Sequence, residues 1–346
     1  MTQASAAPGL RSRLWPRFPA FAEPAGPPPV PGRRALQICL GLVWLLDAGL
    51  QFQPYMFGPF FVTQAIKLSA AGSPSVVASS VDWVSQLMLQ HIALYNALFA
   101  TTQLLIGCGM LFRRTVRLAL AGSIAWALAV WWFGESLGGI FTGASPLAGF
   151  PGAVVLYALI AVLLWPADRK PDGQALARKP GFPASPATSG PLGGRWANAL
   201  WVVLWGSFAY FLLLPDNRAP DAIAQILSTT DGQPAWIVSL MDGMSSLVGE
   251  RGTEISVVLA VACGAVAAGI LVRPAIKPAL AVSILLGLFF WIAEGAGGIF
   301  TGQGTDPNTG LLLILLAACY WPWGGASVGV PAVPDDGRSI RLPYGN

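Results

Sequence analysis

Apolar residues run in long stretches along the whole chain, and short polar turns separate them. A hydrocarbon core about 30 Å thick needs about 20 mainly apolar helical residues to cross it. Eight segments meet this requirement, at 35–55, 87–112, 116–134, 148–165, 195–214, 254–272, 277–294 and 308–324. The pattern predicts an all-α, polytopic integral membrane protein with about eight transmembrane helices.

One phrase occurs twice, as ESLGGIFTG at 135–143 and EGAGGIFTG at 294–302, each time after a tryptophan-rich apolar run. Aligning the chain on this phrase places Arg114 opposite Arg273 and Trp132 opposite Trp291. We therefore predict two four-helix repeats. Each repeat has an even number of spans, so both should have the same orientation in the membrane, as parallel repeats.

The predicted organisation follows from these spans. It consists of a disordered cytoplasmic segment (1–34), a first membrane repeat (35–166), a cytoplasmic linker (167–194), a second membrane repeat (195–324) and a cytoplasmic tail (325–346). The linker is rich in Pro, Gly, Ser, Lys and Arg, which is typical of disordered connections. The loops at 54–86 and 215–253 each contain a stretch with helical apolar spacing, which predicts a short amphipathic helix at the outer surface.

The repeated phrase predicts a turn at the outer end of the third helix of each repeat. Its glycines permit positive φ, so the helix should end near the glutamate and the backbone should turn after it. Close helix approach is one explanation for the small residues, and a backbone-lined binding site is the other. The loop residues concerned are Gly138, Gly139, Thr142, Gly143, Gly297, Gly298, Thr301 and Gly302.

Composition supports the membrane prediction and adds an orientation. Hydrophobic residues make up 54% of the chain and charged residues 10%, where a soluble domain has roughly a quarter charged residues; the mean hydropathy is +0.61. Of the 20 Lys and Arg residues, all except Lys67, Arg218 and Arg251 fall in alternate connections. The positive-inside rule then predicts that both termini and the linker lie in the cytoplasm. The basic residues report topology, so no nucleic-acid partner is predicted.

Polar side chains within the apolar spans are the candidates for chemistry. Asp47 lies inside the first span, where a carboxylate is costly unless it is neutral or paired. The second span carries His91, which shares a helical stripe with Tyr95 and Thr102, and also Asn96 and Gln103, which share another stripe. Asp47 is either a functional group or a protonated structural one. His91, the only histidine, is either a binding group or a simple hydrogen-bonding residue at the interface.

Glu135 and Glu294 are the acids present at equivalent positions of both repeats. If they meet, they could share a proton or hold an oxygen-loving cation. If they lie apart, each should accept hydrogen bonds from backbone or indole N–H groups and order its own loop. The four cysteines lie in apolar runs without metal-ligand spacing, so no metal site is predicted.

Two stretches carry a family resemblance. The segments LGLVWLLDAGLQ (40–51) and TQLLIGCGMLFRRTVRLALAGS (102–123) resemble the DoxX/DoxD-like group of four-helix bacterial membrane proteins. The resemblance covers about the first three helices of each repeat. It implies a four-helix unit and a membrane redox partner such as a quinone-reducing subunit. The duplication and the repeated phrase depart from that family, and no functional residue follows from the likeness.

Three functions are compatible with these residues. The leading hypothesis is a permease-like or channel-like protein of the bacterial cytoplasmic (inner) membrane. It would bind a proton, a cation or a small solute at a polar site in the outer half of the bundle. A membrane redox component is the alternative that requires a cofactor, a quinone stacked on Trp131 and Trp132. The third is a non-catalytic protein whose acidic outer loops contact a membrane or extracytoplasmic partner. No catalytic residue and, for the leading hypothesis, no cofactor is assigned; the lipid bilayer is the expected environment.

Overall fold

The computed structural model describes residues 32–166 and 189–323. The described residues are all-α, with no strand among them. Most of the predicted segment 1–34, much of the linker 167–194 and all of the tail 325–346 lie outside the described residues. The first helix begins at Arg33 and the seventh at Gly193, so the last residues of the predicted segment 1–34 and of the predicted linker 167–194 are helical.

Twelve α-helices make up the described chain, with short 3₁₀ turns between them. They are α1 (Arg33–Leu50), α2 (Lys67–Ser69), α3 (Ser75–Gln90), α4 (Ile92–Leu111), α5 (Val116–Phe133), α6 (Ala153–Leu164), α7 (Gly193–Leu212), α8 (Ala222–Leu227), α9 (Ala235–Val248), α10 (Gly252–Gly269), α11 (Ile276–Ala293) and α12 (Asn308–Tyr320). A π-helix, Phe61–Ile66, runs directly into α2. The eight predicted spans correspond to α1, α4, α5, α6, α7, α10, α11 and α12.

Four of these helices are long and apolar enough to cross a membrane: α4, α5, α10, and α11 together with its leading turn. The helices α6 and α12 are apolar but have only 12 and 13 residues. At 1.5 Å per residue each is about 20 Å long, which is less than the hydrocarbon thickness. The predicted span 148–165 therefore starts five residues too early, because the backbone turns at Pro151 and Gly152 before α6 begins.

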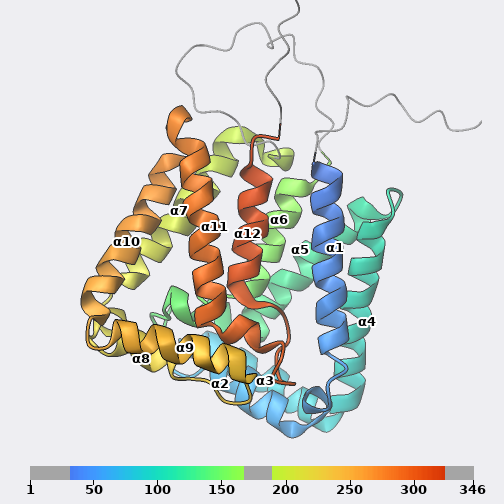
Figure 1. Ribbon diagram of the computed structural model, residues 1–346. Coiled ribbons are helices and arrows are strands. Elements are labelled where there is room, and N and C mark those ends of the chain that lie inside the picture. Colours follow the sequence, from blue (N-terminus) through green and yellow to red (C-terminus); the bar gives the residue numbers. More distant parts are fainter. Residues whose placement is uncertain (1–31, 167–188, 324–346) are drawn as a thin grey trace, which may run out of the picture.

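The eight helices that correspond to the predicted spans pack as one bundle, with α6 and α12 at its centre. In each half the helices pack in chain order, α1 on α4, α4 on α5 and α5 on α6, then α7 on α10, α10 on α11 and α11 on α12. The halves meet where α6 packs on α12 and α1 contacts both. Figure 1 shows the start of α1 and the ends of α6 and α12 at the same end of the bundle. A single cluster of buried apolar side chains joins both halves.

The short outer helices cover the opposite end of the bundle. Figure 1 shows α8 and α9 lying across the ends of α10 and α11, and α2 and α3 at the same end of the molecule. The two predicted amphipathic helices are confirmed as α3 and α9. The predicted span 87–112 is wrong at its start, because the chain breaks at His91, between α3 and α4.

The repeated phrase forms the predicted turn in both halves. The preceding helices end at Phe133 and Ala293, one or two residues before the glutamates. All six glycines of the loop motif have positive φ, between 62° and 78°. Leu137 and Ala296 also have positive φ, and each packs into a small apolar cluster beneath the outer helix of its half, α3 or α9. The two turns are therefore similar in backbone and in what covers them.

Large apolar side chains are exposed along the outer faces of the bundle helices. Leu42, Leu105, Leu118, Val203 and Leu285 each expose more than half of their surface. Soluble proteins rarely leave apolar surface of this extent in contact with water. Together with the long apolar helices, it is the surface expected of a protein in contact with lipid.

Candidate functional site

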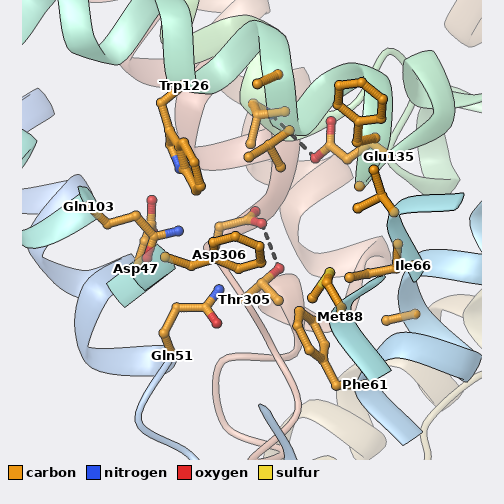
Figure 2. Close-up of a pocket in the computed structure, with 18 of the residues that line it drawn as sticks. Asp47, Gln51, Phe61, Ile66, Met88, Gln103, Trp126, Glu135, Thr305 and Asp306 are labelled. Atoms are coloured by element: carbon orange, nitrogen blue, oxygen red, sulfur yellow. Dashed lines mark hydrogen bonds between the residues drawn. The ribbon is translucent and has the colours of Figure 1, made fainter. Parts of the chain in front are cut away.

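A cavity of about 260 Å³ lies between α1, α4, α5 and the covering segment that contains the π-helix and α3, toward the end of the bundle that the short helices cover. The loop that precedes α12 completes it (Figure 2). Its lining comprises Trp44, Asp47, Gln51, Phe61, Ala65, Ile66, Val84, Met88, Phe99, Gln103, Trp126, Ala129, Val130, Phe133, Gly134, Glu135, Val154, Thr305 and Asp306. Side chains from both halves of the chain therefore form one site.

Asp47 projects from α1 into this cavity and is almost fully buried, with 1% of its surface exposed. Its Oδ2 accepts a hydrogen bond of 2.6 Å from the hydroxyl of Tyr157 on α6. Its Oδ1 has no hydrogen-bond partner among the described residues. A buried polar atom without a partner is costly, so this oxygen is a candidate contact for a bound molecule. In the second half the aligned residue is Phe208, which is fully buried among aromatic rings.

Glu135 lies just after α5 and holds the start of α6. Its Oε1 accepts hydrogen bonds from the backbone N–H groups of Ala153, at 3.1 Å, and Val154, at 3.3 Å. A carboxylate suits this position because the first N–H groups of a helix have no partner within the helix. Its Oε2 has no partner in the described chain and borders the cavity. The carboxylate thus has one structural oxygen and one oxygen available to a ligand.

Asp306 reaches the cavity from the loop before α12, in the other half of the chain. Its Oδ2 accepts a 2.8 Å hydrogen bond from Thr305, and its Oδ1 accepts a 2.7 Å hydrogen bond from the backbone N–H of Asn308. Figure 2 shows its carboxylate between Asp47 on one side and Glu135 on the other. The sequence prediction missed Asp306, which sits in a polar loop where an acid is unremarkable.

Amide and indole groups complete the polar lining. Gln51 and Gln103 are buried. Their side-chain oxygens have no hydrogen-bond partner within the described chain, and neither does the indole N–H of Trp126. Asn96 donates a 2.7 Å hydrogen bond to the backbone oxygen of Gln51, so it holds the end of α1 and does not line the cavity. Trp126 packs on Phe99, with 5.3 Å between ring centroids, and this pair forms an aromatic wall.

The lining of the cavity is acidic in composition. Three carboxyl groups line it, and none of its lining residues is Lys, Arg or His. Burial raises the pKa of Glu135 well above its usual range, and the nearby Asp306 raises it further, against the hydrogen bonds from Val154 and Ala153. Burial likewise raises the pKa of Asp306, against its hydrogen bonds from Thr305 and Asn308. A positive ligand would stabilise both carboxylates.

The predicted site residues separate into two groups. Asp47, Gln103 and Glu135 come together in the cavity. His91 is exposed at the break between α3 and α4, and neither it nor Glu294 is part of the lining. Glu294 instead accepts hydrogen bonds from the hydroxyl of Thr309 and from the backbone N–H of Gly310, at the start of α12.

Glu135 and Glu294 have the same structural role at two different helices, α6 and α12. Each accepts hydrogen bonds at the first turn of the helix that follows its own loop, as the structural alternative for these residues predicts. Glu135 differs from Glu294 in that its second oxygen borders the cavity. One copy of the motif thus contributes to the candidate site, and the other does not.

Close packing explains the first glycine of each GG pair. A Cβ on Gly138 would lie 2.6 Å from the backbone nitrogen of Gly152 and closer still to the carbonyl oxygen of Pro151. A Cβ on Gly297 would lie 2.7 Å from the carbonyl oxygen of Pro307. In both halves the turn thus packs against the proline that precedes the central helix. The glycines support the site through backbone packing, and none of them is part of the cavity lining.

The fold and the cavity together describe an all-α protein with several apolar helices, four of them long enough to cross a membrane, and an acidic cavity between them. Comparisons with protein-family models, curated proteins and solved structures found no match to the chain. The resemblance to DoxX/DoxD-like proteins stays a prediction. Within the described residues, no group of three or more His, Cys, Asp and Glu side chains could hold a metal ion.

Proposed function

We propose that this chain is a permease-like protein of the bacterial cytoplasmic membrane that binds a positively charged or proton-donating solute in the cavity. Eight spans cross the bilayer as two parallel four-helix repeats, with both termini in the cytoplasm. The positions of Lys and Arg support this topology. Within the described residues, all of them except Lys67, Arg218 and Arg251 lie near the end of the bundle that the proposal assigns to the cytoplasm.

One observation supports the proposal above the others. Five unpartnered buried polar atoms, on Asp47, Gln51, Gln103, Trp126 and Glu135, border the same cavity. Buried polar groups are normally satisfied within the protein or by a bound molecule. Their concentration at one site, beside three carboxyl groups, indicates a place where a polar molecule is held.

The short central helices suit transport. Irregular backbone at membrane depth is tolerated where protein covers it or where it borders a cavity, and many transporters bind their substrates beside such interrupted helices. The turns before α6 and α12 are segments of this kind. The covering segment from Phe61 to Met88 separates the cavity from the outer surface, and movement of this segment would open an outward route.

Flux in reconstituted vesicles tests the proposal. The purified protein is placed in liposomes, and proton, sodium, potassium and small organic-cation fluxes are measured under an imposed gradient. We expect at least a ten-fold loss of flux in Asp47→Asn and in Asp306→Asn, since each removes a carboxylate from the cavity. Asp82→Asn is the matched control, because Asp82 is partly exposed, pairs with Lys67 and is not part of the cavity lining. Undiminished flux in both cavity variants would refute the site.

The redox alternative makes a different prediction for the same preparation. A quinone stacked on Trp131 and Trp132 would copurify and be recovered in a solvent extract. Neither tryptophan lines the cavity; Trp131 donates a 2.7 Å hydrogen bond to the backbone oxygen of Pro151. Stoichiometric quinone would favour the redox function over the permease function. A stoichiometric protein partner would favour the assembly function.

A further inference from the structure

We propose that the cavity binds a small organic ammonium ion, through carboxylates contributed by both halves of the chain and through its aromatic walls. This inference rests on the proposed function and specifies the substrate class of the same site. Three observations support it: the carboxyl groups, the unpartnered acceptors and the aromatic rings all line the same cavity.

The sign of the charge is the first step. Asp47, Glu135 and Asp306 come from three separate parts of the chain, and no lining residue carries a positive charge. The amides of Gln51 and Gln103 can present either oxygen or nitrogen to a ligand, so the carboxyl groups determine the preference. An anion would be repelled by ionised carboxylates, and a neutral ligand could donate hydrogen bonds to them but would not offset their buried charge.

A bare metal ion fits this arrangement poorly. Sodium, calcium and magnesium are held by several oxygen ligands that converge at about 2.0–2.6 Å from the ion. In the described chain no cluster of acidic, histidine or cysteine side chains is tight enough for that. Asp47 and Glu135 each leave one oxygen unpartnered, on different elements around a cavity of about 260 Å³. An ion with several N–H donors and a carbon body can contact both carboxylates and fill the space between them.

Aromatic rings supply the second part of the recognition. Trp44, Phe61, Phe99, Trp126 and Phe133 all line the cavity. Aromatic faces attract alkylammonium groups, and the attraction is stronger when the pair is shielded from water. The rings also suit the apolar portion of the ligand. The volume is just below the roughly 300–1,000 Å³ of pockets for drug-sized ligands, so the expected ligand is smaller than these.

Hydrogen-bond geometry favours a primary or secondary ammonium over a quaternary one. The unpartnered oxygens of Asp47 and Glu135 are acceptors, and a carboxylate accepts strongly from a charged N–H donor. A quaternary ammonium has no N–H group and would leave both oxygens without a partner. We therefore expect benzylammonium to bind better than its trimethylated form, benzyltrimethylammonium.

Calorimetric titration of the purified full-length protein tests the substrate class. Benzylammonium is the probe, and benzyl alcohol is its neutral match in shape; sodium chloride and benzyltrimethylammonium are titrated separately. We expect benzylammonium to bind at least ten-fold tighter than benzyl alcohol, and sodium at equal concentration not to displace it. Equal binding of the alcohol, or displacement by equimolar sodium, would overturn the inference.

Two variants assign the binding to this cavity. Asp306→Asn should weaken benzylammonium binding at least ten-fold, because it removes a carboxylate and leaves its loop partners in place. Trp126→Leu should weaken it about three-fold or more through loss of the ring. Asp82→Asn should bind as the unmodified protein does. Thermal unfolding of each variant in the same detergent checks that it is folded, and a folded Asp306→Asn protein with unchanged affinity would refute the site.

The binding and flux measurements separate the two proposals. Sodium or proton flux that requires Asp47, without benzylammonium binding, would overturn the ammonium inference and leave the permease function supported. Tight benzylammonium binding without any flux would support the ammonium inference and refute the permease function.

Discussion

Substituting Gly138 by alanine should destabilise the protein strongly, because the new Cβ would be strained by the backbone conformation and would also overlap neighbouring atoms. Gly138 has a φ of 62°, and a side chain in this left-handed conformation costs about 1–2 kcal/mol. The new Cβ would also overlap the backbone of Pro151 and Gly152. Forcing extra volume into a packed site costs about 1–3 kcal/mol more. We expect a total loss of about 2–5 kcal/mol.

Two other glycines separate these costs. Gly302, in the second copy of the phrase, has a φ of 78° but nothing within 4 Å of its Cβ position, so Gly302→Ala tests the backbone strain alone. Gly206 lies within α7 with open space and without positive φ. Alanine there should leave stability unchanged or raise it by up to about 1 kcal/mol, since glycine is unfavourable inside a helix.

The assay is unfolding by SDS titration in mixed micelles, followed by far-ultraviolet circular dichroism. The expected order of stability is Gly206→Ala at or above the unmodified protein, then Gly302→Ala, then Gly138→Ala. If Gly138→Ala unfolds at the same SDS fraction as Gly302→Ala, the packing of the turn against Pro151 contributes nothing, and the explanation given for this glycine is wrong.

Three further outcomes follow from the same contacts. Burial raises the pKa of Glu135 and of Asp306, so both carboxyls are neutral at low pH. Cation binding should therefore strengthen as the pH rises through these raised pKa values. The unliganded protein should lose stability over the same pH range, which starts near the ordinary pKa of about 4. Titrations and melting curves between pH 5 and 9 measure both effects, and opposite signs would contradict them. Glu294→Gln should lower stability by about 1 kcal/mol through weaker contacts at the start of α12 but leave benzylammonium affinity unchanged, as unfolding and calorimetry would show. Trp132→Phe should remove the 3.0 Å hydrogen bond to Ser80 that ties α5 to α3, and hydrogen exchange of α3 should then be faster than in the unmodified protein.

Much of the fold could be predicted from the apolar pattern, because a membrane helix must satisfy its backbone within itself and expose carbon to lipid. The errors lie where that pattern continues through a backbone break. Apolar residues flank Gln90 and His91 on both sides, so the pattern continues from α3 into α4, yet the chain turns at His91. The start of α6 was set too early for a related reason, because the residues from Pro146 onward are apolar but form a 3₁₀ turn before the helix.

The candidate site was predictable only in part. Asp47 was identifiable because a carboxylate inside an apolar span is costly and therefore informative. Asp306 was not, because its position depends on how the loop after α11 folds over the other half of the bundle. His91 and Glu294 had suitable chemistry and spacing along the chain, but the break before α4 and the separate turn before α12 place them outside the cavity.

The position of Asp306 has a consequence for how the chain can be divided. The first 166 residues contain α1, α4, α5 and the covering segment, but they lack the acid and the threonine that complete the cavity. Expressed alone, this portion would contain Asp47 and Glu135 but not the loop with Thr305 and Asp306 that completes the cavity. A second copy of the same portion could not supply that loop. Co-expression with the remainder of the chain should restore binding through assembly in trans. The site thus depends on both portions of the chain, since loss of either portion removes part of the binding surface.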